Sequence, residues 1–469
     1  MADDLTPLEW AVRLKRRHEA ELDKLRALDA YYEGIQPLAY MHPELMAELG
    51  DRIKAVVVNW PRLVVDAVEE RIDLEGFRRD SDSEADSKLW EFWQYNNLDE
   101  GSQQAHVDAM VMRRSFVTVG ANPDEDAPPL ITVESPLQMY ADIDPATRRV
   151  RAVLRRWYDD KSADEGVERE QFATLYLPND TFHYKIDGEW EEGDHDEHNL
   201  GVVPVVPLVN RPRLMEPLGV SELADVMPLS DAACKVATDM MVAAEYHAVP
   251  RRWVFGADKK DFVGPDGKPL TTWQQIMGRL WANEQGPQDI AAGQFPESDL
   301  SNFHNTINAL ARLVASLTGL PPHYLGYSTE NPASADAIRS SEARLVKRAE
   351  RKMRAWGGSW EQVMRLAERI RDGKWNDKSR GLEAIWRDAS TPTEAAKADA
   401  VVKKVQAQII DAEQAWEDLG YTFAQRERMR ERKKAAEESM ARVMSGDLAA
   451  TVGPKPERDG QPVDDELEE

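Results

Sequence analysis

Two histidines and three carboxylates are neighbours in the sequence, at Asp194, His195, Asp196, Glu197 and His198. Imidazole nitrogens and carboxylate oxygens together can bind a divalent ion, so this segment is the candidate for a metal-dependent hydrolase. Neighbouring residues of one loop cannot all converge on one ion, however. The favoured interpretation is therefore a solvated acidic loop after a β-hairpin, without a metal.

The motifs of the common enzyme classes are absent from the sequence. The run from Gly264 to Lys268 reads GPDGK and is followed by Pro269, which indicates a tight turn and no phosphate-binding GxxxxGK[ST] loop. No GxSxG, HExxH or GxGxxG motif occurs either. The sequence therefore predicts neither a nucleotide-hydrolysing motor nor any other enzyme, and no cofactor.

Basic side chains form a second group that could do chemistry. Between Arg339 and Arg354 they fall on one side of a predicted helix, whereas Leu345, Met353 and Trp356 fall on the other. Such a row could contact phosphates, or it could pair with acids on a neighbouring helix or subunit. We favour the pairing.

Two helices and the loop between them would position this basic row. Gly319 and the prolines after it end the first helix, because glycine adopts the left-handed turn and proline cannot continue a helix. The pair Gly357-Gly358 predicts a kink in the second helix. Residues 321–332 are predicted to form an exposed loop. The apolar stripe of the first helix consists of Leu300, Phe303, Ile307, Leu310, Val314 and Leu317.

Composition limits the possible classes of protein. The chain has 469 residues, of which 42% are hydrophobic, so we expect two to four structural units with a substantial core. A formal net charge of −26 does not favour binding of nucleic acid by charge neutralisation; it indicates solubility, and it also suits a surface that must not adhere to a polyanion. Cys234 is the one cysteine, which excludes an intrachain disulfide and a Cys-based zinc site. The acidic amino-terminus is not a signal peptide, and no apolar run is long enough to cross a bilayer.

The remaining patterns predict an α+β, mainly helical fold. Proline-rich residues 201–212 indicate an extended connector, residues 142–145 a turn, and residues 445–469 a disordered tail. Pro228 should restart or kink its helix. The predicted helices are 5–30, 43–49, 62–72, 83–95, 101–113, 221–247, 272–281, 395–412 and 423–444, and the predicted strands are 115–120, 130–134, 150–158, 171–177, 181–186, 251–255 and 382–387.

Several motifs occur in a fixed order along the chain. They are YYEGIQPL (31–38), NWPRLVVDAVEERI (59–72), GVVPVVPLVNRP (201–212), GVSELADVMPLSDAACKVATDMMVAAEYHAVPRRWVFG (219–256), LTGLPPHYLGYSTENPASADAIRSSEARLV (317–346) and IWRDASTPTEAAKADA (385–400). This order resembles the portal proteins of tailed double-stranded-DNA bacteriophages, of the type with long non-contractile tails.

The resemblance implies a portal fold that assembles into a ring with a central channel. The regions implied are a wing (1–218), a first stem helix (219–250), a clip (251–296), a second stem helix (297–318), a tunnel loop (319–333), a kinked wing helix with a strand (334–390), a crown (391–444) and an acidic tail (445–469). The family suggests no role for this tail.

The resemblance also implies site residues. The DNA-facing tunnel loop would contain Tyr324, Tyr327, Ser328, Thr329, Glu330 and Asn331. The clip surface that contacts the terminase or adaptor would contain Arg251, Arg252, Trp253, Lys259, Lys260 and Lys268. The helix between subunits would contribute Arg339, Arg344, Lys347, Arg348 and Arg351.

The implied partners are those of a genome-packaging channel in the virion, at one capsid vertex, made in the bacterial cytoplasm. They are a homo-oligomer of twelve subunits, double-stranded DNA bound without sequence specificity, the terminase large subunit, a head-completion or adaptor protein, and the major capsid and scaffold proteins, with no membrane. Two other hypotheses stay open at this point: a metal-dependent hydrolase that uses residues 194–198, and a helical scaffold protein without a channel.

Overall fold

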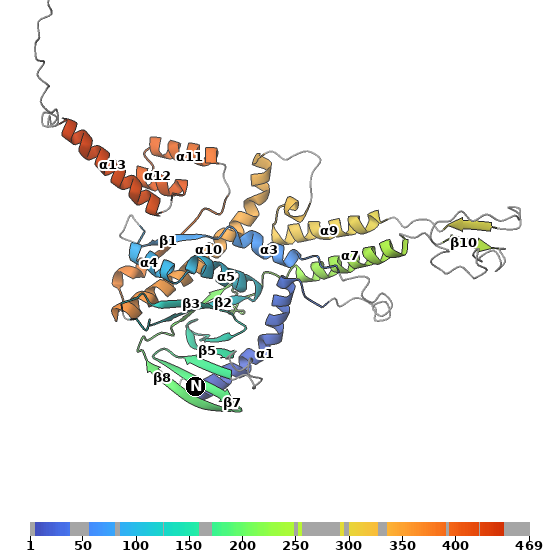
Figure 1. Ribbon diagram of the computed structural model, residues 1–469, viewed down its shortest axis with the longest axis horizontal. Helices are drawn as coiled ribbons and strands as arrows, with labels where there is room; N and C mark the ends of the chain where they lie inside the picture. Colours follow the sequence, from blue (N-terminus) through green and yellow to red (C-terminus); the bar gives the residue numbers. More distant parts are fainter. Residues whose placement is uncertain are drawn as a thin grey trace, which may run out of the picture. The chain divides into compact units, whose positions relative to one another are not determined.

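Helices and short antiparallel sheets alternate along the chain (Figure 1). The computed structural model describes residues 5–37, 56–79, 85–124, 126–158, 171–247, 252–255, 291–294, 300–326, 335–390, 394–421 and 423–444. The chain divides into two compact units, Met1–Ser390 and Thr391–Glu469. The mixture of helix and sheet agrees with the predicted α+β class.

The helices of the first unit are α1 (Pro7–Glu33), α3 (Trp60–Glu69), α4 (Ser87–Tyr95), α5 (Leu98–Val111), α7 (Met227–His247), α9 (Ser301–Thr318) and α10 (Ala335–Asp372), with the 3₁₀ helices η3 (Pro322–Leu325) and η4 (Asp377–Gly381). The second unit contains α11 (Glu394–Gln406), α12 (Ala412–Leu419) and α13 (Phe423–Met444). No helix of the described residues is long and apolar enough to cross a membrane.

All strand pairs of the described residues are antiparallel. The largest sheet has the order β4-β5-β6-β7-β8, a second has the order β3-β2-β9, and β1-β12 and β10-β11 form two-stranded sheets. The bounds are β1 (Leu74–Arg78), β2 (Arg114–Gly120), β3 (Leu130–Glu134), β4 (Met139–Ile143), β5 (Val150–Tyr158), β6 (Gln171–Tyr176), β7 (Asp180–Asp187), β8 (Glu189–Glu197), β9 (Val205–Val209), β10 (Arg252–Phe255), β11 (Ala291–Gln294) and β12 (Glu383–Trp386).

Local sequence signals explain several helix ends. Thr6 and Glu9 form a capping box at the start of α1, and Gly34 ends that helix in the left-handed conformation. Asn59 caps α3, in which Pro61 lies in the first turn. Pro228 likewise lies in the first turn of α7, so it starts the helix there and places no kink within it.

The proline-rich connector was predicted wrongly, because it contains strand β9. Pro207 lies within β9, opposite Phe116 of β2. A proline cannot donate to a ladder, but β9 pairs on one side alone and is an edge strand of its sheet. The prolines argue against a central strand, but they do not exclude an edge strand such as β9.

Other boundaries also differ from the predictions. The expected turn at 142–145 begins two residues late, since Asp142 and Ile143 end strand β4. The expected acidic loop is strand β8. The predicted helix 395–412 is interrupted between α11 and α12. Strands β1, β4 and β11 were not predicted, and the predicted helices at 43–49 and 272–281 lie outside the described residues.

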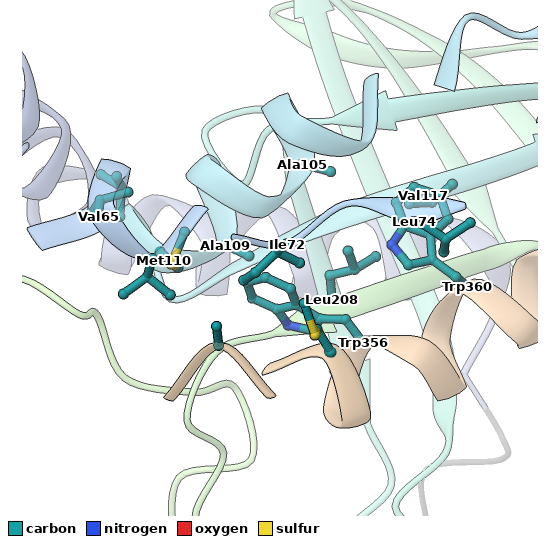
Figure 2. Packing of buried hydrophobic residues seen from close by; sticks show 14 of the residues in the cluster. Val65, Ile72, Leu74, Ala105, Ala109, Met110, Val117, Leu208, Trp356 and Trp360 are labelled. Atoms are coloured by element: carbon teal, nitrogen blue, oxygen red, sulfur yellow. The ribbon is translucent and has the colours of Figure 1, made fainter. Parts of the chain in front are cut away.

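Helix α10 passes through the main hydrophobic core of the first unit. Trp356 and Trp360 are buried and extend from α10 toward Leu208 and Val117 of the neighbouring strands (Figure 2). The Trp360 Nε1 donates to Nε2 of His106, 3.0 Å away, and the His106 ring stacks on Trp356 at 4.7 Å. Burial lowers the pKa of His106 to about 3, so this ring is neutral at ordinary pH.

The first glycine of the pair in α10, Gly357, allows close packing. Hydrogen-bonded helix continues through Gly357 and Gly358, and the ribbon of α10 changes direction along its length (Figure 1). A Cβ atom at Gly357 would lie 3.3 Å from the Trp386 Nε1 and 3.6 Å from the Ala384 Cβ. A glycine at this position therefore lets strand β12 approach α10 closely.

Candidate functional site

Helices α7 and α9 lie side by side, and the chain between them contains the β10-β11 hairpin (Figure 1). The segment just before α7 and the last turn of α9 both form hydrogen bonds with α10. Of the stripe predicted on α9, Val314 is buried, whereas Leu317 is 56% exposed in the single chain. We call the place where α7, α9 and α10 meet the helix junction.

A buried carboxylate forms the centre of the helix junction. Glu222 lies five residues before α7 and is 3% exposed. Its Oε2 accepts from the Lys352 Nζ at 2.7 Å, and Arg348 donates to its Oε1. Asn210, also buried, accepts from Lys352 and donates to Glu222 at 3.1 Å. The three ionic groups thus join the segment before α7 to helix α10.

Charge, more than solvation, sets the protonation of Glu222. Burial alone would raise the pKa of this carboxyl, but Lys352 and Arg348 outweigh it and lower the pKa to about 2. Burial lowers the pKa of Lys352 from its ordinary value, and Glu222 opposes that shift. The Glu222 carboxyl is ionised at neutral pH, and Glu222 and Lys352 depend on each other for compensation.

The end of α9 is attached to α10 by two arginines. The Arg344 Nη1 donates to the carbonyl oxygen of Ser316 at 2.7 Å, and Arg348 donates to that of Thr318. These carbonyls belong to the last turn of α9, which ends at Gly319 with φ 73°. Cations at this position also interact favourably with the helix dipole.

Tyr324 anchors the beginning of the predicted tunnel loop. Its hydroxyl accepts from the Arg71 Nη2 at 3.0 Å and lies 3.4 Å from Glu342. Arg71 and Glu342 are themselves 3.3 Å apart. Tyr324 is half-buried, so its side chain is directed into its own subunit. The other residues assigned to the loop lie outside the described residues: Tyr327, Ser328, Thr329, Glu330 and Asn331.

The basic side of α10 has an inner and an outer part. Arg348 and Lys352 point to Glu222 in the same chain, whereas Arg344, Lys347 and Arg351 are exposed. Together with Leu317, these side chains line an open cavity of about 570 Å³, which we call the cationic groove. Arg339 is half-exposed and lies near the start of the helix.

The acidic segment brings together a different set from the one that the sequence suggested. His195 and Glu197 of β8 lie beside Asp180 of β7, and their ligand atoms fall within 4.8 Å of one another. Nε2 of His195 is 3.1 Å from Oδ1 of Asp180, and its ring stacks on Phe182 at 4.2 Å. Asp196 points to the other side of the strand. The three groups are half or fully exposed, and a solvated surface explains them.

The clip residues fall mostly outside the described part of the chain. Arg252 and Trp253 lie in β10, opposite Gln294 and Gly293 of β11. The others are Arg251, Lys259, Lys260 and Lys268.

The sequence analysis missed Glu222 and Asn210, which complete the helix junction. One signal was present: Glu222 is an acid in the mainly apolar run from Val220 to Val226. A buried charge needs a partner, so such an acid indicates a buried cation elsewhere. The basic side of α10 supplies it.

Comparison with known proteins identifies the class of molecule built in this way. A family model described as phage portal protein, SPP1 Gp6-like, matches residues 12–440. The chain belongs to this phage portal family. It is 41% identical to the portal protein of Mycobacterium phage D29 over 428 residues, which cover 88% of this chain and 85% of that protein. It is 43% identical to the portal protein of Mycobacterium phage L5 over 386 residues, 80% of this chain and 78% of that one.

Proposed function

We propose that this protein is the portal of a phage capsid, a ring at one vertex through which double-stranded DNA is packaged and ejected. Membership of the portal family supports the role. The observation that carries it is the helix junction, where two adjacent helices leave the body of the subunit and the loop after α9 starts beside a buried ionic cluster. The role is structural, without catalysis or a cofactor.

The regions follow from this role. Residues 1–218 and 334–390 would form the wing, α7 and α9 the stem, residues 251–296 the clip, and α11, α12 and α13 the crown. Tyr324 would anchor the tunnel loop, so the residues proposed to face DNA are 327–331. The clip would contact the terminase large subunit and later the head-completion or adaptor protein, while the wing would meet capsid and scaffold proteins.

Twelve copies would close the ring through heterologous contacts, in which one face of a subunit meets a different face of the next. The exposed part of the cationic groove is available for such a contact, since Arg351 and Lys347 are exposed in the single chain. Arg348 is less suited, because it is occupied within its own subunit. The assembled ring would be a virion component, made in the bacterial cytoplasm.

The acidic charge supports passage of DNA. The whole chain has a net charge of −26, and a channel wall of the same acidic character would repel a polyanion and let it slide, because backbone affinity comes from lysine and arginine.

Imaging of the purified protein tests the proposal. We expect rings of about a dozen copies by negative-stain electron microscopy and native mass measurement, with a hole as wide as duplex DNA, and weak binding of duplex DNA even in low salt. A protein that stays monomeric with its scaffold and capsid proteins present would contradict the ring. Tight binding of DNA by the rings would contradict the sliding wall.

A further inference from the structure

The first unit also contains an acidic cavity, whose charge is opposite to that of the cationic groove. It has a volume of about 650 Å³ and is formed by α3, α5 and the segments around β2 and β3. No lysine or arginine is among the described residues that line it. Its carboxylates are Asp66, Glu69, Glu70, Asp108 and Glu134.

Some of these carboxylates have internal partners and others do not. Asp66 accepts from Tyr32 at 2.9 Å, and Glu134 lies 3.1 Å from Arg155. Glu69 is half-buried, and no hydrogen bond or ion pair joins its carboxylate to the described residues around it. Glu70 is exposed at the rim of the cavity. Arg62 lies 3.4 Å from Asp66 as well, so two of the five carboxylates have a basic partner and the cavity keeps a negative excess.

The raised pKa values of two of these carboxyl groups show that their ionisation in the cavity is unfavourable. Burial, and then the carboxylates of Asp73, Asp66 and Glu70, raise the pKa of Glu69 to about 7. Burial raises the pKa of Asp108 to about 6. A hydrogen bond with Ser135 acts to lower this pKa, and the charge of Asp29 raises it slightly. A cation that entered the cavity would favour the ionised forms and release protons.

The cationic groove has the complementary excess. Arg211 pairs with Asp225, Arg348 and Lys352 share Glu222, and Lys347 lies 2.6 Å from Glu350. Within the exposed row Arg344, Lys347 and Arg351, the two arginines thus have no acidic partner among the described residues. The groove and the cavity share no residue. Two complementary and separate patches are what a heterologous contact between copies requires.

We propose that the acidic cavity of α3 and α5 receives the exposed cationic row of α10 from a second copy of this chain. The inference rests on the proposed ring and specifies the surfaces that close it. Lys347 and Arg351 of one copy would approach Glu69 and Glu70 of the next. The buried ion pairs of the helix junction would stay within each subunit.

Charge reversal in two separate variants tests the contact. Glu70→Lys with Gln104→Lys makes the cavity rim positive, and Lys347→Glu with Arg351→Glu makes the row negative; all four side chains are exposed, so folding should persist. Each variant alone is expected to need at least about tenfold more protein for ring assembly, because like charges would then face each other.

An equimolar mixture of the two variants is expected to restore rings. Each copy would then meet a complementary neighbour on both sides, native charges at one interface and exchanged charges at the next. A matched control, Glu91→Lys with Gln94→Lys on α4, alters the same residue types at exposed positions outside the cavity and should assemble as the wild type does.

The outcomes separate the two proposals. Wild-type protein that forms no rings would contradict the proposed function itself. Normal rings from either single variant, or impaired variants that the mixture does not restore, would overturn the pairing of cavity and row while leaving the portal role intact.

Proton release gives a second readout of the contact. The charged groups beside Glu69 are Asp66 of α3 and, after that helix, Glu70 and Asp73, while Asp29 of α1 lies near Asp108. Tyr32 and Glu134 also line the cavity, in which Arg62 pairs with Asp66 and Arg155 with Glu134. Because the carboxyl pKa values are raised in the free subunit, ring assembly should strengthen as the pH rises from 6 to 8, and Glu69→Gln should weaken this dependence. An assembly profile of Glu69→Gln identical to that of the wild type would count against the contact.

Discussion

Replacing Glu222 by alanine is expected to lower the free energy of unfolding by about 3–5 kcal/mol, the cost of leaving buried charges without a partner. Lys352 is 8% exposed and would lose its one acid, and Arg348 would lose its carboxylate as well. Guanidinium unfolding followed by tryptophan fluorescence measures the change, because Trp356 lies one turn from Lys352.

The matched control is Glu350→Ala on α10. Glu350 pairs with Lys347 at 2.6 Å, but both side chains are exposed, so the loss should stay within about 1 kcal/mol. The double variant Glu222→Ala with Lys352→Met should recover part of the lost stability, since it removes the uncompensated ammonium group. Equal losses for Glu222→Ala and Glu350→Ala would show that the buried cluster does not hold the junction.

Gly219→Ala is expected to be the second most damaging change. Gly219 has φ +83°, and a Cβ there would lie 2.5 Å from the carbonyl oxygen of Asn210 and 2.6 Å from that of Arg113. Backbone atoms cannot move aside as a flexible side chain does. Left-handed strain and overpacking together predict a loss of about 2–5 kcal/mol. The same turn precedes Glu222, so the junction would be displaced.

Gly326→Ala separates strain from crowding. Gly326 also has φ +83°, but a Cβ there meets no described atom within 4 Å. It should lose about 1–2 kcal/mol, the cost of the left-handed backbone alone. The difference between the two variants, measured by the same unfolding experiment, isolates the contact with Asn210 and Arg113. A difference near zero would mean that the turn relaxes without cost.

The sequence predicted the elements that depend on local patterns. The period of α9, the left-handed Gly319 that ends it and the apolar side of α10 all come from residues a few positions apart, and each is present. The β1-β12 sheet was not predictable in this way. It pairs Leu74 with Trp386, and no local pattern records a partner so distant in the chain.

The features of the candidate site also divide into those that local patterns predict and those that depend on distant segments. The basic side of α10 was evident from helical spacing, but which of its cations turn inward depends on Glu222 and Asn210, which come from other segments. Tyr324 was assigned to an exposed loop because its neighbours are glycine and proline. Its hydrogen bonds to Arg71 and Glu342 are contacts between distant segments that spacing alone cannot reveal.

Strand β8 has a consequence for protein that has not yet assembled. It is the last strand of the five-stranded sheet, so one row of its backbone groups has no strand beside it among the residues that the structure describes. Such an edge can pair with the same edge of another copy and start a fibril. In that pairing its exposed carboxylates would lie opposite those of the other copy, and their repulsion would disfavour stacking of newly made subunits: Glu189, Glu191, Glu192, Asp194, Asp196 and Glu197.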